Sequence, residues 1–356
     1  MSLQTSTLAA TGILLAAVLD RSIGDPASWL HPVVVMGWGI KQMRLKAENW
    51  AMDQPLKLSI AGYLITVTLV MGSGISGWLL EQLMLGELLP GQQFLGDSAG
   101  SHGWVNILAS ACWVLALASA LAGKSLEDGA RRVLQALPAE RNAEPIEARQ
   151  RLSWIVGRDT TELSVDEILR ATAETASENA VDGLFAPLFW MLVGLGLWSA
   201  GLTNAPGPLA LAWSFKAAST LDSMLGYRKG RLRWLGTAGA RLDDLLIWIP
   251  CRLVMLTLPL VSQTIDRWAS LVLAAERDGQ HDPSPNAGRS EAIYAHCAEV
   301  QLGGRNRYEA GWVDKPLLGN GFQGASKQSV ETILNLSRRL EMLWLLMALG
   351  CTLWLS

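Results

Sequence analysis

Long uncharged runs constrain this chain more than any other feature. Residues 58–80 are 23 consecutive positions without a charged side chain, and residues 1–19, 103–123 and 183–215 are also uncharged. A helix of about 20 apolar residues crosses the hydrocarbon core of a bilayer, so each run has the length for a span. The hydrophobic share of 50% and the sixteen Trp residues agree with a membrane protein, because Trp favours the membrane interface.

The distribution of Lys and Arg predicts the topology. Residues 20–57, 124–182, 216–244 and 267–339 carry five, eight, six and nine Lys or Arg, whereas residues 81–103 carry none. Positive residues favour the cytoplasmic side, so the four basic segments are expected in the cytoplasm, and segment 81–103 and the amino terminus outside. The net charge of −3 argues against nucleic acid as a partner.

These patterns predict an all-α, polytopic membrane protein with about four to six membrane helices. The break from Asn204 to Pro208 predicts a helical hairpin within residues 183–215. Pro250, Arg252 and Pro259 interrupt the apolar residues 245–265, which favours a broken or re-entrant element there. The chain is read as a single integral membrane domain, 1–356, whose cytoplasmic loops (about 20–57, 124–182, 216–244 and 267–340) form the active site.

An acidic helix precedes the fourth uncharged run, residues 183–215. Ser164 followed by Glu167 is a capping-box signature and predicts a helix that begins at Val165. Three carboxylates then share one face of that helix: Glu174, Glu178 and Asp182. They lie within an arc of roughly 80° over about 12 Å of the axis, and they repel one another unless a cation compensates them. A solvated face is the plain alternative, but the uncharged run begins at Gly183, so the stripe is expected to abut the membrane.

Further polar clusters lie on the same predicted side. One comprises Lys216, Asp222, Arg228, Arg241, Asp243 and Asp244. Paired carboxylates suit Mg²⁺ and nearby cations suit phosphate, although an interfacial salt-bridge network has the same composition. Another comprises the segment from Ser284 to Gly288 and the pair Gly303-Gly304, whose backbone N–H groups are expected either to receive a phosphate or amide-rich ligand or to form an ordinary loop. The P-loop sequence Gly-x-x-x-x-Gly-Lys-[Ser/Thr] is absent from the chain.

Together these clusters resemble the adenosylcobinamide-phosphate synthase family of cobalamin biosynthesis. The matching motifs follow the chain in order: Asp20-Arg21 with Gly24-Asp25-Pro26, His31-Pro32-Val33, Gly157 to Thr160, Glu174 to Asn179, Asp182-Gly183, Thr220 to Tyr227, Ala240 to Asp244, Pro250 with Arg252, Ser284 to Gly288, Leu302 to Gly304, and Lys315-Pro316. Each motif alone is weak, but their joint occurrence over nearly the whole chain is specific.

The resemblance implies a membrane enzyme that joins adenosylcobyric acid to aminopropanol, or to its phosphate, through an amide with ATP and Mg²⁺. It implies catalytic roles for Glu174, Glu178, Asp182, Lys216, Asp243 and Asp244, and Mg²⁺ ligation by Glu174, Glu178, Asp182, Asp222, Asp243 and Asp244. It implies phosphate or corrinoid binding by Arg158, Arg228, Arg241, Arg252, Ser284, Asn286, Gly288, Gly303, Gly304 and Lys315. Asp20, Asp25 and His31 are further candidate site residues.

Two other function classes stay open, namely a corrinoid transporter or binding protein and a non-catalytic membrane sensor. A transporter exposes its charged stripe to both compartments in turn, and a sensor tolerates loss of the carboxylates. The expected location is the bacterial inner membrane with the active site facing the cytoplasm. Expected partners are a corrinoid and membrane lipid, while oligomers and other late cobalamin-pathway membrane enzymes are left open.

Overall fold

The computed structural model describes residues 2–24, 31–86, 102–140, 143–262, 265–308 and 311–354. The chain divides into two compact units. Unit 1 comprises Met1–Ala122, Ala186–Leu246 and Leu346–Ser356, and unit 2 comprises Gly123–Phe185 and Ile247–Leu345. Each unit is therefore assembled from segments that are distant in the sequence.

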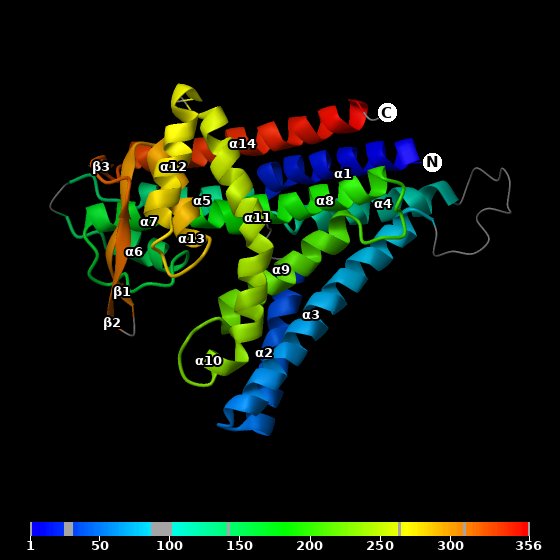
Figure 1. Ribbon diagram of the computed structural model, residues 1–356, viewed down its shortest axis with the longest axis horizontal. Coiled ribbons are helices and arrows are strands. Elements are labelled where there is room, and N and C mark those ends of the chain that lie inside the picture. The colour runs from blue at the N-terminus through cyan, green and yellow to red at the C-terminus, as the bar shows by residue number, and fades with distance from the viewer. Residues whose placement is uncertain are drawn as a thin grey trace. The chain divides into compact units, whose positions relative to one another are not determined.

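Unit 1 is helical throughout its described part. Its helices are α1 (Ser2–Ile23), α2 (Pro32–Ala51), α3 (Pro55–Met84), α4 (His102–Ala118), α8 (Ala186–Ser199), α9 (Pro208–Leu225), the short α10 (Leu232–Leu235), and parts of α11 (Thr237–Val261) and α14 (Lys327–Trp354). Helices α2 and α3 run side by side, and α3 also packs against α9 and α10 (Figure 1). Buried apolar residues form a core where α2, α3, α9 and α10 meet, among them Ile40, Ile65 and Leu221.

The predicted hairpin is formed by α8 and α9, and α3 holds it at its turn. The Glu81 carboxylate of α3 is fully buried and accepts hydrogen bonds from the backbone N–H of Gly207 at 2.9 Å and of Leu209 at 2.6 Å. These N–H groups belong to the start of α9, where the helix itself supplies no acceptors. Glu81 therefore caps a helix that begins more than a hundred residues later.

Unit 2 combines helices with a small sheet. Its elements are α5 (Gly123–Gln135), α6 (Ile146–Ser153), α7 (Val165–Ala180), the π-helical turn η1 (Val181–Phe185), η2 (Ile265–Arg267), α12 (Trp268–Gly279), α13 (Ala287–Cys297), β1 (Val300–Tyr308), β2 (Gly311–Leu318), β3 (Gln323–Gly324), and the remaining parts of α11 and α14. The strand order is β2-β1-β3, with β1 antiparallel to β2 and parallel to β3.

Helix α7 begins as the sequence predicts. The Ser164 side chain accepts from the Glu167 N–H, and the Glu167 carboxylate accepts from the Ser164 N–H at 2.8 Å, which completes the capping box. The helix continues through η1 into α8, so the span contains a π-helical turn at Asp182-Gly183. Such turns occur frequently at functional sites.

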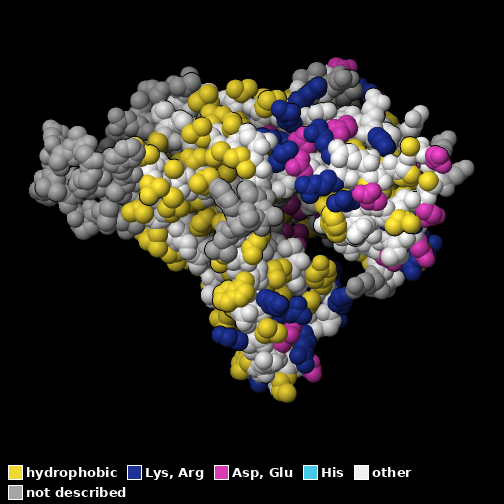
Figure 2. All heavy atoms as spheres, turned by 180° about the vertical axis from the view of Figure 1, so that it is seen from behind, with side chains coloured by type: hydrophobic (Ala, Val, Ile, Leu, Met, Phe, Trp, Pro, Cys, Tyr) yellow, Lys and Arg dark blue, Asp and Glu magenta, His cyan; other side chains and the backbone are white. Residues whose placement is uncertain are grey.

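Four helical segments in the described part of the chain are long and apolar enough to cross a membrane: Thr5–Ile23, Pro55–Met84, Val165–Ser199 and Thr237–Val261. A broken pair, Ile107–Ala118 with Gly123–Gln135, passes the same criterion and makes a fifth. Large apolar side chains are exposed on these segments, including Leu15, Leu64 and Met71. Figure 2 shows hydrophobic side chains gathered over a broad area of this face. The prediction of a polytopic helical membrane protein is confirmed.

The structure differs from the sequence-based prediction in three details. Helix α11 runs without a break through Pro250 to Val261, so the interruption expected in residues 245–265 is wrong, and the broken pair lies in residues 107–135 instead. Residues 267–340, expected as a cytoplasmic loop, contain helices and the three-stranded sheet, which adds strands to the all-α prediction. The apolar residues from Met342 onward predict a short final helix, but α14 begins earlier, at Lys327.

Candidate functional site

In unit 2, the acidic stripe of α7 is compensated by buried cations. Arg158 Nη2 lies 2.5 Å from Glu174 Oε2, and their side chains are 8% and 1% exposed. The other carboxylate oxygen, Oε1, accepts from the Gly303 N–H at 2.9 Å. Both oxygens of Glu174 are thus engaged, and the expected cationic partner is present. The solvated-face alternative is wrong for Glu174.

A web of polar contacts ties this ion pair to β1. Arg158 Nη1 donates to the Asn306 side-chain oxygen at 2.8 Å, and Arg170 donates to the same oxygen at 3.1 Å and to the Gly303 carbonyl. Gly303 and Gly304 both have positive φ values, +81° and +89°, at a bulge between β1 and β2. An added Cβ at Gly303 would lie 1.9 Å from the Pro316 carbonyl oxygen, so the backbone of this bulge itself favours glycine at both positions.

A second buried group surrounds Lys315 of β2. Its Nζ lies 3.1 Å from Glu291 Oε1 and 3.5 Å from Asp282 Oδ2, and Glu178 of α7 is an electrostatic neighbour. The Glu291 side chain is 1% exposed, and its second oxygen has no hydrogen-bond partner in the described structure. Lys315 therefore stands among three carboxyl groups from different elements.

The charges in this group depend on pH. Burial raises the pKa of Glu291 to about 8, although the Lys315 ammonium acts in the opposite direction. Burial alone would lower the pKa of Lys315, but Glu291, Glu178 and Asp282 outweigh it and raise that pKa. At neutral pH, Glu291 therefore holds a proton while Lys315 stays charged.

The segment from Ser284 to Gly288 forms the entry to α13. Ser284 Oγ accepts from the Ala287 N–H at 3.1 Å, and Arg252 donates to the Asn286 side chain at 2.5 Å and to the Pro285 carbonyl at 2.9 Å. Arg252 also lies over the Trp248 ring, 4.6 Å from its centroid. These contacts make the segment a structured turn that fixes the guanidinium of Arg252. Gly288 packs close to Asp282.

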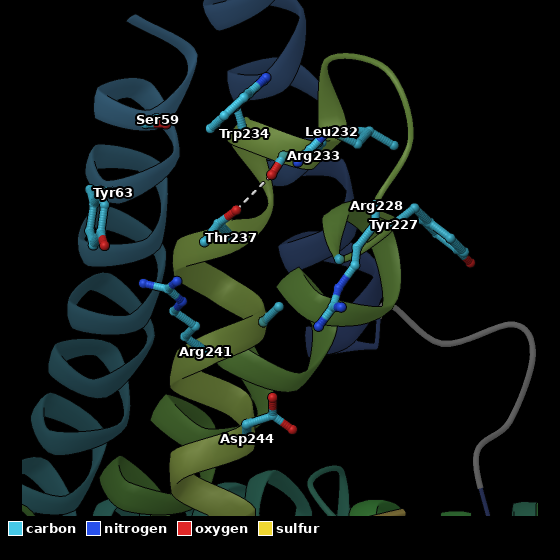
Figure 3. A pocket seen from close by; sticks show the side chains of 12 residues that line it. Ser59, Tyr63, Tyr227, Arg228, Leu232, Arg233, Trp234, Thr237, Arg241 and Asp244 are labelled. Carbon is cyan, nitrogen blue, oxygen red and sulfur yellow. Dashed lines mark hydrogen bonds between the residues drawn. The ribbon is translucent and has the colours of Figure 1, made fainter. Parts of the chain in front are cut away.

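In unit 1, three arginines line a cavity of about 590 Å³: Arg228, Arg233 and Arg241. Asp244 lies in the same wall, with Ser59 and Tyr63 of α3 opposite (Figure 3). Nearby, Asp243 is 7% exposed, and its Oδ1 has no hydrogen-bond partner within the described residues. Its electrostatic neighbours are Lys216, Asp222 and Asp244. The predicted cluster of Lys216, Asp222, Arg228, Arg241, Asp243 and Asp244 thus lies within this unit.

The other candidate residues lie elsewhere. Asp182 is half-buried in η1 and is an electrostatic neighbour of Cys251. Asp20 is buried near the end of α1, and His31 caps α2 by accepting from the Val33 N–H at 3.3 Å. Asp25 lies outside the described residues.

The carboxylates named as magnesium ligands divide between the units. Glu174, Glu178 and Asp182 belong to unit 2, whereas Asp222, Asp243 and Asp244 belong to unit 1. Within the residues described, no group of three or more His, Cys, Asp or Glu side chains is arranged to hold a metal. Mg²⁺ bound mainly by ATP phosphates needs only one or two carboxylates, and such an ion stays a prediction.

Comparison with known proteins shows the family to which the chain belongs. A sequence profile described as CobD/CbiB protein matches residues 13–337. A cobalamin biosynthesis protein CobD from Synechocystis sp. is 38% identical over 94% of this chain and 89% of its own length. A cobalamin biosynthesis protein CbiB from Salmonella typhi is 33% identical over 96% of this chain and 95% of its own length. The chain belongs to the CobD/CbiB family. No solved structure matches it.

Sequence reasoning missed several polar residues of this CobD/CbiB protein that the structure places at the site. Glu291, Asp282 and Asn306 contact residues that were named, namely Lys315 and Arg158. Glu291 stands three residues after Gly288 and directly before the apolar Ala292-Ile293. A single carboxyl group at the edge of an apolar segment could have indicated a buried site residue. Asn306 carried no local signal, because its partners are more than a hundred residues away.

Proposed function

We propose that this CobD/CbiB protein is an ATP-dependent ligase that joins the carboxyl group of adenosylcobyric acid to aminopropanol, or to its phosphate, as an amide. Membership of a family whose relatives are named cobalamin biosynthesis proteins supports the pathway. The observation that carries the chemistry is the group of Lys315, Glu178 and Glu291, in which a largely buried cation lies near two carboxyl groups. Burying an ammonium group is costly, so its retention favours a functional role.

The reaction needs activation because a carboxylate does not react with an amine at neutral pH. The substrate carboxylate attacks the γ-phosphorus of ATP, which gives an acyl phosphate and ADP. The amine nitrogen then attacks the acyl carbon, inorganic phosphate leaves, and the nitrogen loses one proton. Mg²⁺ carried by ATP would neutralise the phosphate oxygens during the first step.

The structure suggests how the candidate residues share these tasks. Glu178 is only half-buried and lies near the Lys315 cation, so it is proposed to orient the amine and receive its proton. Lys315 is proposed to stabilise the negative charge of the acyl phosphate. Arg158 and Arg252 are engaged by protein groups, so their part in phosphate binding is secondary to holding Glu174 and Asn286. Lys216, Arg228 and Arg241 stay candidates for binding phosphate. Asp243 and Asp244 stay candidates for binding the metal-bound co-substrate.

The decisive experiment uses purified protein with adenosylcobyric acid, ATP, Mg²⁺ and each candidate amine, with products identified by mass. Glu178→Gln is expected to lower turnover by at least about 100-fold, since it removes both the charge and the proton acceptor. The matched control is Glu162→Gln, an exposed carboxylate paired with Arg307, and it should keep wild-type turnover.

Two results would count against this proposal. Wild-type turnover in Glu178→Gln would exclude the role of that carboxylate. Corrinoid binding without ATP-dependent product in the wild type would instead favour the transporter, binding-protein or sensor alternatives.

A further inference from the structure

The lining of the arginine-lined cavity of unit 1 holds more positive than negative side chains. Arg228, Arg233 and Arg241 face it together with a single carboxylate, Asp244, which has Arg228 as its electrostatic neighbour. Neither Arg233 nor Arg241 forms an ion pair with a carboxylate in the described part of the chain. The cavity wall therefore carries a net positive charge of about two, which favours an anionic ligand.

Other arginines at the same end of unit 1 behave differently. Arg44 of α2 lies 2.8 Å from Glu48, and Arg231 lies 2.7 Å from Asp53. Arg231 is only two residues from Arg233 but does not line the cavity. Arg233 and Arg241, which line the cavity, thus lack a carboxylate partner in the described part of the chain, whereas Arg44 and Arg231 outside it are paired.

The form of the cavity suits a group with several acceptor oxygens. In Figure 3, Arg241 extends from α11 toward α3, where Ser59 and Tyr63 present hydroxyl groups. The Thr237 hydroxyl is already used, because it donates to the Arg233 carbonyl at 2.6 Å. Guanidinium and hydroxyl donors that converge from two helices are the usual partners of a phosphate group.

The position of the cavity along its helices indicates the depth at which the ligand is held. Helix α3 has 30 residues, which at 1.5 Å per residue is about 45 Å, the thickness of a bilayer including its headgroups. Ser59 and Tyr63 lie about 6 and 12 Å from the start of this helix, and Thr237 to Asp244 form the first two turns of another candidate span. The lining thus lies where two spans enter the headgroup region, with Trp234 as an interfacial aromatic residue.

We propose that this cavity binds a phosphate group at the membrane surface. Two sources supply that chemistry: the headgroup of an anionic lipid, and a soluble phosphate ester such as the substrate phosphate for which Arg228 and Arg241 are candidates under the proposed function. The depth of the cavity and the exposed aromatic side chains Tyr63 and Trp234 at its wall favour the lipid headgroup.

The test measures ligand-induced thermal stabilisation of the full chain in detergent, so it is independent of turnover. The probes are phosphatidylglycerol, zwitterionic phosphatidylcholine, inorganic phosphate and O-phosphoethanolamine. For the wild type, phosphatidylglycerol should raise the melting temperature more than phosphatidylcholine does, and salt should weaken the effect. Arg233→Gln and Arg241→Gln should each lose at least half of that rise.

Control variants separate charge from fold. Arg231→Gln removes one positive charge from the same segment outside the cavity and should keep the full response. Arg241→Lys retains the charge and should keep part of it, which guards against a variant that simply folds poorly. If only inorganic phosphate and O-phosphoethanolamine raise the melting temperature, and Arg233→Gln and Arg241→Gln lose that rise, the site binds a phosphate ester rather than a lipid. An equal response of Arg231→Gln and Arg241→Gln to every probe overturns the proposal.

Discussion

Among single residues, Glu291 has the clearest link between burial and a measurable pH dependence. Its carboxyl is 1% exposed, and burial raises its pKa to about 8 from an ordinary value of 4.5. Between these two pH values the folded protein holds a proton that the unfolded chain releases. The protonated Glu291 carboxyl therefore makes its full contribution to the unfolding free energy below pH 4.5, and this contribution is lost as the pH rises toward 8.

Replacing this carboxyl by an amide should remove that pH dependence. In Glu291→Gln, the fall in unfolding free energy between pH 5 and 8 should be smaller than in the wild type, by up to about 1.4 kcal/mol per pH unit. Thermal unfolding in detergent across this pH range measures it. Glu299→Gln, an exposed carboxylate paired with Arg267, should follow the wild type. Parallel curves for Glu291→Gln and the wild type would show that Glu291 is ionised throughout.

Between elements, the contact of α3 with the start of α9 makes the sharpest prediction. Glu81 accepts from three backbone N–H groups, those of Gly207, Leu209 and Ala210. Glu81→Ala leaves these buried donors without an acceptor, so it should lower the unfolding free energy by about 3 kcal/mol or more. Gln82→Ala is the matched control, because Gln82 is equally buried but makes one hydrogen bond, to the Thr203 carbonyl. Equal melting temperatures for the two variants would contradict the capping role.

The same contact shows what the sequence allowed us to predict. Local signals were sufficient for the Ser164 capping box, the break before Pro208 and the apolar spans, because each depends on residues close in the chain. Glu81 was read as the first residue of an exterior loop, since the backbone groups that it binds lie far along the chain. Proline signals in α11 were overridden, and the helix passes through Pro250. The stripe on α7 was found, but Asn306, which accepts from Arg158, and Glu291, which pairs with Lys315, were not.

On the scale of the whole molecule, the ligase proposal requires one orientation in the membrane. The segments that carry the proposed site residues, 124–182, 216–244 and 267–339, hold all but a few of the charged candidates. Their Lys and Arg content predicts that all three face the cytoplasm, where ATP and the corrinoid acid are available, and this requires that α11 enters the bilayer without carrying residues 267–339 to the other side. The residues 81–103, without Lys or Arg, are predicted on the other side.

Reporter fusions test this orientation directly. A cytoplasm-active reporter joined after residue 140 or after residue 230 should be active, and the same reporter after residue 95 should be inactive, because that fusion ends in the segment without positive charge. A reporter active only outside the cytoplasm should give the reverse pattern and serves as the control for expression. If the fusions after residues 140 and 230 report opposite compartments, Glu178 and Asp244 cannot serve one reaction, and the ligase proposal fails while the family assignment stands.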